Sequence, residues 1–216
     1  NQLALIFEKK DVAIVCGGTG LYIKALCEGL DDMPPVNPEI EQRINAEFAE
    51  KGIQWLQQQL YSVDEDFATI GEMNNPTRML RALIFKLSVG QSISSYRTGI
   101  VKKRPFRIIK IALDLPRELL YKRINLRVDM MVQNGLIKEA EALLPFKQLK
   151  NLNTVGYAEL FDYFDGRCDL TFAIEKIKQH SRNYAKRQIT WFKKDHSFHW
   201  LIANDPEIVK KIEQFL

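Results

Sequence analysis

Cysteine is scarce in this 216-residue sequence, and long apolar runs are missing from it. The three cysteines, Cys16, Cys27 and Cys168, form no CxxC pair, so the sequence predicts reduced thiols and neither a disulfide framework nor a zinc ribbon. No stretch approaches the roughly 18 uninterrupted apolar residues of a membrane-spanning helix, and no basic-then-apolar leader opens the chain. We therefore expect no membrane partner and a cytoplasmic protein.

Common catalytic patterns are also missing. The sequence contains no GxxxxGK[ST] phosphate loop, and no Ser–His–Asp or paired-carboxylate arrangement that spacing alone would single out. Among the three histidines only His196 and His199 are close in sequence, and no cysteine accompanies them, which argues against a metal site. We therefore predict no metal ligand within this chain.

Charge is segregated along the chain. Residues 28–72 hold 2 basic and 11 acidic side chains, residues 73–128 hold 13 and 2, and residues 171–194 hold 7 and 1. Two basic blocks on a chain whose net charge is only +4 favour a positive face that attracts a polyanion. Solvated helix faces would explain the same pattern, so charge alone does not choose between these two interpretations.

The apolar pattern predicts strands near both ends of the chain. DVAIVC at 11–16 is typical of a strand buried in a parallel sheet, and a glycine-rich turn at 17–20 leads from it into a helix. FRIIKIALDL at 106–115 and FHWLIA at 198–203 are predicted as two further strands. Three strands do not complete such a sheet, so we expect its other strands to precede Asn1 and the chain to be a C-terminal fragment.

The middle of the chain is predicted to be helical. Three prolines within residues 31–38 exclude regular structure and indicate a linker. Beyond it, apolar residues recur at helical spacing with a break at Gly52, and Asn75 followed by Pro76 marks the start of another helix. The predicted domains are a partial α/β core at 1–33 and 104–216, and an all-helical insertion at 34–103.

Helices also follow the second predicted strand. They lie on both sides of Gly135, within 153–166, and in a long segment that starts near Asp169 or Thr171. In the long helix, a stripe of Arg182, Lys186 and Lys193 runs beside a stripe of His180, Tyr184, Arg187 and Trp191. A cationic stripe beside aromatic rings suits single-stranded nucleic acid, whereas a solvated face with the two large rings buried is the alternative.

The Gly17-Gly18-Thr19-Gly20 turn has two interpretations. Glycines allow backbone N–H groups to face an anion at a helix N-terminus, and Thr19 would lie at the edge of the sheet where ligands of open α/β folds bind. Glycine clusters also occur in many turns that only connect a strand to a helix, and taken alone the cluster favours this second interpretation. A ligand site at Thr19 remains the alternative.

Four sequence blocks together resemble the tRNA dimethylallyltransferase (IPP transferase) family. They are GGTGLYIKAL at 17–26, NNPTRMLRAL at 74–83, NTVGYAELFDYFDG at 153–166 and SRNYAKRQITWFKKD at 181–195. The resemblance implies a P-loop NTPase-like α/β core with a helical insertion that contacts tRNA. It also implies transfer of a dimethylallyl group from dimethylallyl diphosphate to N6 of adenosine 37, beside the anticodon of tRNAs that read UNN codons, with release of diphosphate.

The same resemblance implies where ligands bind. The P-loop and the catalytic aspartate of the family match nothing in this sequence, so we expect no catalytic residue within the chain, an inactive fragment, and Mg²⁺ held mainly by an upstream part. The protein is expected to act as a monomer on the tRNA anticodon arm. The implied tRNA-binding residues are Thr19, Thr77, Arg78, Met79, Leu80, Arg81, Asn183, Tyr184, Ala185, Lys186, Arg187 and Gln188.

One departure from the family pattern restricts this assignment. Some relatives carry an arginine just before the VGY triplet, where this chain has Asn153 and Thr154. A phosphate-binding role at that place is therefore not transferred. Two other hypotheses are an RNA-binding module without chemistry and a structural helical domain, the latter of which leaves the order of the four blocks unexplained.

Overall fold

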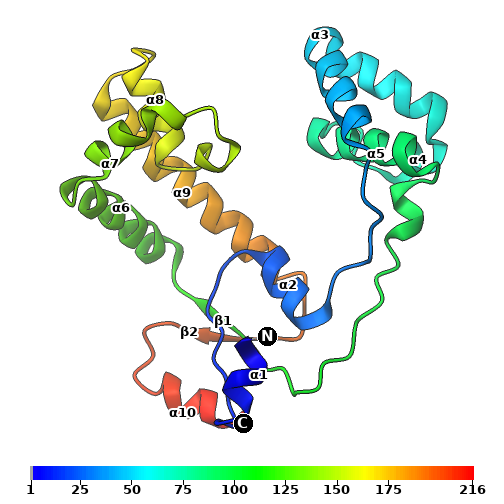
Figure 1. Ribbon diagram of the computed structural model, residues 1–216. Helices are drawn as coiled ribbons and strands as arrows, with labels where there is room; N and C mark the ends of the chain where they lie inside the picture. The colour runs from blue at the N-terminus through cyan, green and yellow to red at the C-terminus, as the bar shows by residue number, and fades with distance from the viewer. Residues whose placement is uncertain (1) are drawn as a thin grey trace. The chain divides into compact units, whose positions relative to one another are not determined.

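The computed structural model describes residues 2–216, which form two compact units (Figure 1). Unit 1 comprises the residues up to Ile23 together with Phe106–Leu216, and unit 2 comprises Lys24–Pro105. Helix α2 (Gly20–Glu28) begins in unit 1 and ends in unit 2. No helix among the described residues combines the length and the apolar character that crossing a membrane requires.

The sheet of unit 1 has two parallel strands, β1 (Lys110–Asp114) and β2 (Phe198–Ile202). The register places Lys110 opposite Phe198 and Asp114 opposite Ile202. Both strands lie inside the segments predicted from the sequence, so these two predictions are confirmed for five residues each. The observed fold is helix-rich and of the α/β type, with a small parallel sheet.

The strand predicted at 11–16 is wrong. These residues have no regular secondary structure, and among the described residues β1 and β2 pair only with each other. Ile14 is 86% exposed and Val15 is 58% exposed, which is the opposite of a buried strand. A run of β-branched residues favours an extended backbone but does not supply the hydrogen-bonded neighbour that a strand requires.

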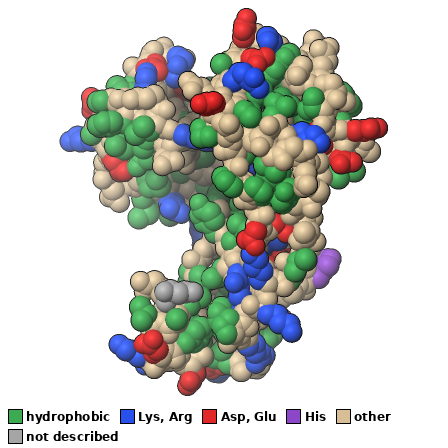
Figure 2. Space-filling model, turned by 45° about the vertical axis from the view of Figure 1, so that its right-hand side comes forward, with side chains coloured by type: hydrophobic (Ala, Val, Ile, Leu, Met, Phe, Trp, Pro, Cys, Tyr) green, Lys and Arg blue, Asp and Glu red, His purple; other side chains and the backbone are tan. Residues whose placement is uncertain are grey.

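Other hydrophobic side chains also reach the surface on the face shown in Figure 2.

A bundle of helices forms the main core of unit 1. The sequence signals for its longest helix are confirmed, because Asp169 caps α9 by accepting a hydrogen bond from the Phe172 backbone N–H over 2.8 Å. The core contains Val128, Leu136, Leu160 and Ile177. The helices of the unit are α1 (Gln2–Phe7), α6 (Arg117–Gln133), α7 (Leu136–Leu143), η2 (Leu144–Phe146), η3 (Lys150–Leu152), α8 (Tyr157–Phe164), α9 (Leu170–Phe192) and α10 (Ile208–Glu213).

Unit 2 is helical, and its main core lies between α3 and α5. Gly52 has a φ of +75°, a value that side-chain-bearing residues rarely adopt, and it interrupts α3 at the predicted break. The Asn75 side chain caps α5 as the sequence predicted. Leu56, Leu60, Met79 and Leu83 are completely buried there. The helices that lie wholly within the unit are α3 (Pro38–Val63), α4 (Glu65–Ile70), α5 (Pro76–Val89) and η1 (Ile93–Tyr96).

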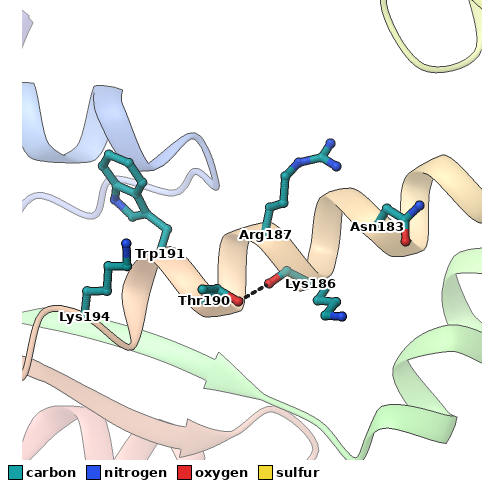
Figure 3. A pocket seen from close by; sticks show the side chains of 6 residues that line it. All are labelled: Asn183, Lys186, Arg187, Thr190, Trp191 and Lys194. Atoms are coloured by element: carbon teal, nitrogen blue, oxygen red, sulfur yellow. Dashed lines mark hydrogen bonds between the residues drawn. The ribbon is translucent and has the colours of Figure 1, made fainter. Parts of the chain in front are cut away.

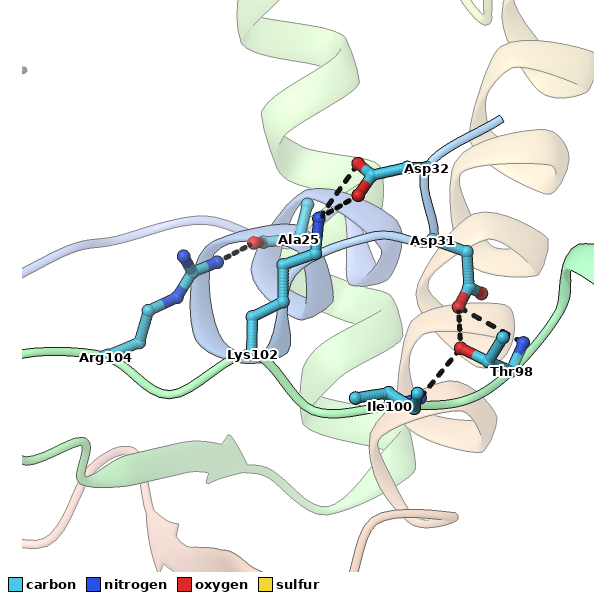
Figure 4. Close-up of polar contacts among 7 residues, drawn as sticks. All are labelled: Ala25, Asp31, Asp32, Thr98, Ile100, Lys102 and Arg104. Carbon is cyan, nitrogen blue, oxygen red and sulfur yellow. Dashed lines mark hydrogen bonds and ion pairs between the residues drawn. The ribbon is translucent and has the colours of Figure 1, made fainter. Parts of the chain in front are cut away.

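The two segments that enter and leave unit 2 are hydrogen-bonded to each other (Figure 4). Thr98 Oγ1 donates to Asp31 over 2.6 Å, and the Lys102 ammonium contacts Asp32 over 2.9 Å. The Arg104 guanidinium donates to the backbone carbonyls of Leu26 and Ala25 at the end of α2. These contacts hold the C-terminal half of α2 to the returning chain within unit 2.

Candidate nucleic-acid interface

The Gly-Gly-Thr-Gly turn contacts one face of α9. The side-chain amide Nε2 of Gln188 donates to the backbone carbonyl oxygen of Gly18 over 2.8 Å. The Thr19 hydroxyl lies 3.5 Å from the Tyr184 hydroxyl. Two residues four positions apart on α9 therefore hold two consecutive residues of the turn, and all four belong to unit 1.

Two glycines of the turn lie directly against side chains of α9. A Cβ atom added to Gly18 would be 2.1 Å from Gln188 Nε2, and one added to Gly20 would be 2.2 Å from Trp191 Nε1. By contrast, a Cβ atom on Gly17 would meet nothing within 4 Å. Gly20 thus leaves room for the Trp191 ring, whereas a side chain at Gly18 would displace the end of Gln188, and sequence spacing revealed neither contact.

An open hollow of about 480 Å³ follows the next face of α9 (Figure 3). Tyr184 and Trp191 are 42% and 44% exposed, so the alternative in which both rings are buried is wrong. Trp191, Thr190 and Lys194 extend this surface beyond the segment implied by the resemblance. The hollow is lined by Asn183, Lys186, Arg187, Thr190, Trp191 and Lys194.

The cations of this hollow are available to a ligand. Lys186 and Lys194 are exposed, and neither has an acidic partner among residues 2–216. The Arg187 guanidinium lies over the Tyr184 ring, 5.6 Å from its centre, and likewise contacts no carboxylate among the described residues. We call Lys186, Arg187 and Lys194 the α9 cation cluster. Such a cluster attracts anions without first losing an internal ion pair.

The rest of the predicted basic stripe has other contacts. Arg182 donates to Asn125 Oδ1 over 2.7 Å and lies over the Tyr121 ring, so it joins α9 to α6. Lys193 lies over the Trp200 ring. Ala185 is half-buried. Of the predicted stripe, Lys186 is therefore the residue that is exposed and whose side chain has no partner among the described residues.

In unit 2, the segment Thr77–Arg81 forms the first turns of α5. The Asn75 side chain fixes the helix start by accepting from the Arg78 backbone N–H over 3.3 Å. Met79 is completely buried in the core and Leu80 packs against it, so these two side chains orient the helix and do not face solvent. Thr77, Arg78 and Arg81 are exposed.

The two arginines of α5 differ in their partners. Arg78 forms an ion pair with Glu72, in which the two side chains are 53% and 58% exposed. The same Glu72 carboxylate accepts from the Asn75 side chain over 3.3 Å. Arg81 has no acidic partner among the described residues. Arg81 is thus free to bind an anion, whereas Arg78 would first have to leave Glu72.

A second polar pair lies within unit 1. Glu159 is 7% exposed, and its carboxylate accepts from the Gly156 backbone N–H over 2.7 Å and contacts His180 Nδ1 over 2.5 Å. It therefore joins the start of α8 to α9, which the sequence did not predict. Across residues 2–216, no three His, Cys, Asp or Glu side chains converge as metal ligands would.

Comparisons with known proteins identify the family. The family model described as IPP transferase matches residues 1–195. A protein of Christiangramia forsetii named tRNA dimethylallyltransferase is 48% identical over 92% of this chain and 66% of its own length. A protein of Phocaeicola vulgatus named tRNA dimethylallyltransferase 1 is 43% identical over the whole chain and 71% of its own length.

A solved structure agrees with these matches. The crystal structure of a tRNA delta(2)-isopentenylpyrophosphate transferase from Staphylococcus epidermidis has a TM-score of 0.59 and 31% identity, over 100% of this chain and 73% of that one. The chain thus spans about two thirds of the length of the curated relatives it matches. With the family model covering almost all of its residues, the chain belongs to the IPP transferase family.

Proposed function

We propose that this chain is the tRNA-facing part of a tRNA dimethylallyltransferase. The reaction is transfer of a dimethylallyl group from dimethylallyl diphosphate to N6 of adenosine 37, in tRNAs that read UNN codons, with release of diphosphate. One observation carries the proposal: the Thr19 hydroxyl lies against α9, the helix that also presents the α9 cation cluster. Relatives that bear the enzyme's name support the same assignment.

The exposed residues have distinct roles in this proposal. Lys186 and Arg187 bind phosphates of the anticodon arm, because phosphate contacts position RNA through charge. Thr19 contacts the region of the adenosine that is turned out of its stacked loop, a step that costs a few kcal/mol and depends on cationic contacts around it. In unit 2, Arg78 and Arg81 bind the loop backbone. Asn183 lies on the same open surface of α9 and supplies a neutral hydrogen-bonding group.

The diphosphate donor and Mg²⁺ are not assigned to binding sites among these residues. The sequence has no P-loop, and residues 2–216 bring no three metal-ligating side chains together. We assign no chemical step to a metal here. We propose that both ligands are held mainly by residues upstream of Asn1, that the chain alone is inactive, and that the protein is a monomer.

A transfer assay tests the proposed function. Labelled dimethylallyl diphosphate and tRNA are incubated with a longer protein that contains this chain and the residues upstream of it, with and without Mg²⁺. We expect label in tRNA at N6 of adenosine 37 when Mg²⁺ is present, and none with the 216-residue chain alone. A longer protein that binds tRNA yet never transfers the label would support the alternative, a non-catalytic RNA-binding module.

A further inference from the structure

Three side chains on one face of α9 hold the Gly-Gly-Thr-Gly turn. Tyr184, Gln188 and Trp191 follow one another at intervals of four and three residues, so they project from the same side of the helix. Gln188 bonds to Gly18, Tyr184 approaches Thr19, and Trp191 packs where Gly20 has no side chain. The turn is therefore held at three successive residues by one rigid helix.

The Gln188 amide differs from its neighbours in what it can still bind. Its side chain is half-buried, and its Nε2 group donates a hydrogen bond to the Gly18 carbonyl oxygen inside unit 1. Lys186 and Arg187, immediately before it, are exposed and have no acidic partner among the described residues. Gln188 thus points toward the protein at the place where its two neighbours point toward solvent.

The two anchors lie on either side of Thr19. The Gly18 carbonyl before it is fixed by Gln188, and the space beside Gly20 after it is filled by the Trp191 indole. With both neighbours held, the Thr19 hydroxyl keeps a defined direction, which the Tyr184 hydroxyl at 3.5 Å supports. Loss of the Gln188 bond would also leave the Gly18 carbonyl without this partner and would loosen the turn.

We propose that Gln188 is a positioning residue, which acts on the reaction by fixing Gly18 and thereby Thr19, and that it does not bind tRNA. This inference rests on the proposed function, in which Thr19 contacts the adenosine. Placement errors of about 1 Å near a reacting group can reduce a rate by about 100-fold, so a single bond to the turn can control turnover. Removal of an RNA contact would instead weaken binding.

The test compares Gln188→Met with Lys186→Ala in the longer, active protein. Methionine keeps the length of glutamine and adds no charge, but it cannot donate to Gly18. We expect Gln188→Met to lower kcat at saturating tRNA by about 10-fold or more, with the Kd for tRNA changed by less than about 3-fold, and to speed hydrogen exchange of the peptide that contains residues 17–20. Lys186→Ala should raise the Kd and leave that exchange rate unchanged.

Two further variants make the outcome decisive. Gln188→Ala should repeat the effect of Gln188→Met, and Gln179→Ala, at an exposed position of the same helix, should change none of the three measurements. The inference is overturned if Gln188→Met weakens tRNA binding as much as Lys186→Ala does, or if it leaves both kcat and exchange unchanged. If the unaltered protein transfers no allyl group, the proposed function fails, whereas the exchange and binding measurements still decide whether Gln188 holds the turn or the RNA.

Discussion

Lys110 and Asp195 join the start of β1 to the segment that follows α9, with the ammonium nitrogen 2.7 Å from a carboxylate oxygen. The other Asp195 oxygen accepts from the backbone N–H and the hydroxyl of Ser197, just before β2. Burial alone would raise the pKa of the Asp195 carboxyl, but the hydrogen bonds from Lys110 and Ser197 outweigh burial and lower it to about 2. This carboxylate therefore fixes the end of α9 against the sheet.

The lowered pKa of Asp195 predicts a specific loss of stability in acid. Because the pKa falls from an ordinary value of 3.8 to about 2 on folding, the carboxylate stabilises the fold above pH 4 and this contribution is lost as the pH drops toward 2. We expect Asp195→Asn to lower the free energy of unfolding by about 1 kcal/mol at pH 6, a value reduced by solvent screening because 35% of the side chain is exposed.

Urea unfolding at several pH values measures this effect. The difference in unfolding free energy between the unaltered protein and Asp195→Asn should shrink between pH 4 and pH 2. Asp11→Asn, at an exposed position in the same unit, is the control and should behave like the unaltered protein. A gap that stays constant down to pH 2 would contradict the role assigned to the Lys110 and Asp195 pair.

The glycines of the turn predict opposite outcomes for two similar substitutions. Gly20→Ala places a methyl group where the Trp191 indole now lies, so the ring must move and the turn must loosen. Gly17→Ala meets no atom within 4 Å and has no strained φ, so it should be tolerated. We expect a shift in tryptophan emission and a loss of about 1–3 kcal/mol in stability for Gly20→Ala only. Equal behaviour of the two variants would refute the close approach of α9.

Local signals in the sequence predicted where helices begin and end, because those signals act over a few residues. Asn75 and Asp169 cap helices as expected, and Gly52 breaks α3 where the pattern placed the break. The strand at 11–16 failed for a different reason, since extended structure depends on a partner that local sequence does not specify. The same distinction between local and distant contacts applies to the candidate site.

The sequence could identify candidate site residues but not their partners. The resemblance implied one common role for residues 183–188, whereas the structure orients them differently: Lys186 and Arg187 face solvent and Gln188 faces Gly18, 170 residues away in the chain. Met79 likewise belongs to an implied binding segment but is completely buried. Helical spacing predicts on which face of a helix a side chain lies, but the neighbour that it meets on that face depends on contacts between distant segments.

Removal of a cation from either unit should weaken tRNA binding in a salt-dependent manner. Arg187→Ala and Arg81→Ala each remove one exposed guanidinium with no acidic partner among the described residues. Each should lower affinity and reduce the slope of log Kd against log salt concentration by about 1, because one phosphate contact fewer releases fewer counterions. Arg78→Ala should act in the same direction. Titrations of labelled tRNA at four salt concentrations measure the slope, and an unchanged slope in both Arg187→Ala and Arg81→Ala would contradict their placement on the RNA.

The ion pair between Arg78 and Glu72 predicts a variant that binds tRNA more tightly. Glu72→Gln keeps an acceptor for the Asn75 side chain but removes the negative charge that competes with phosphate for Arg78. Since both side chains of the pair are more than half exposed, the pair is worth at most about 1 kcal/mol, and we expect affinity to rise by about 2- to 5-fold at low salt. The double variant Glu72→Gln with Arg78→Ala is the control. It should show no gain over Arg78→Ala alone, because the gain acts through the Arg78 guanidinium; an equal gain with and without that guanidinium would mean that Glu72 acts by general repulsion of RNA.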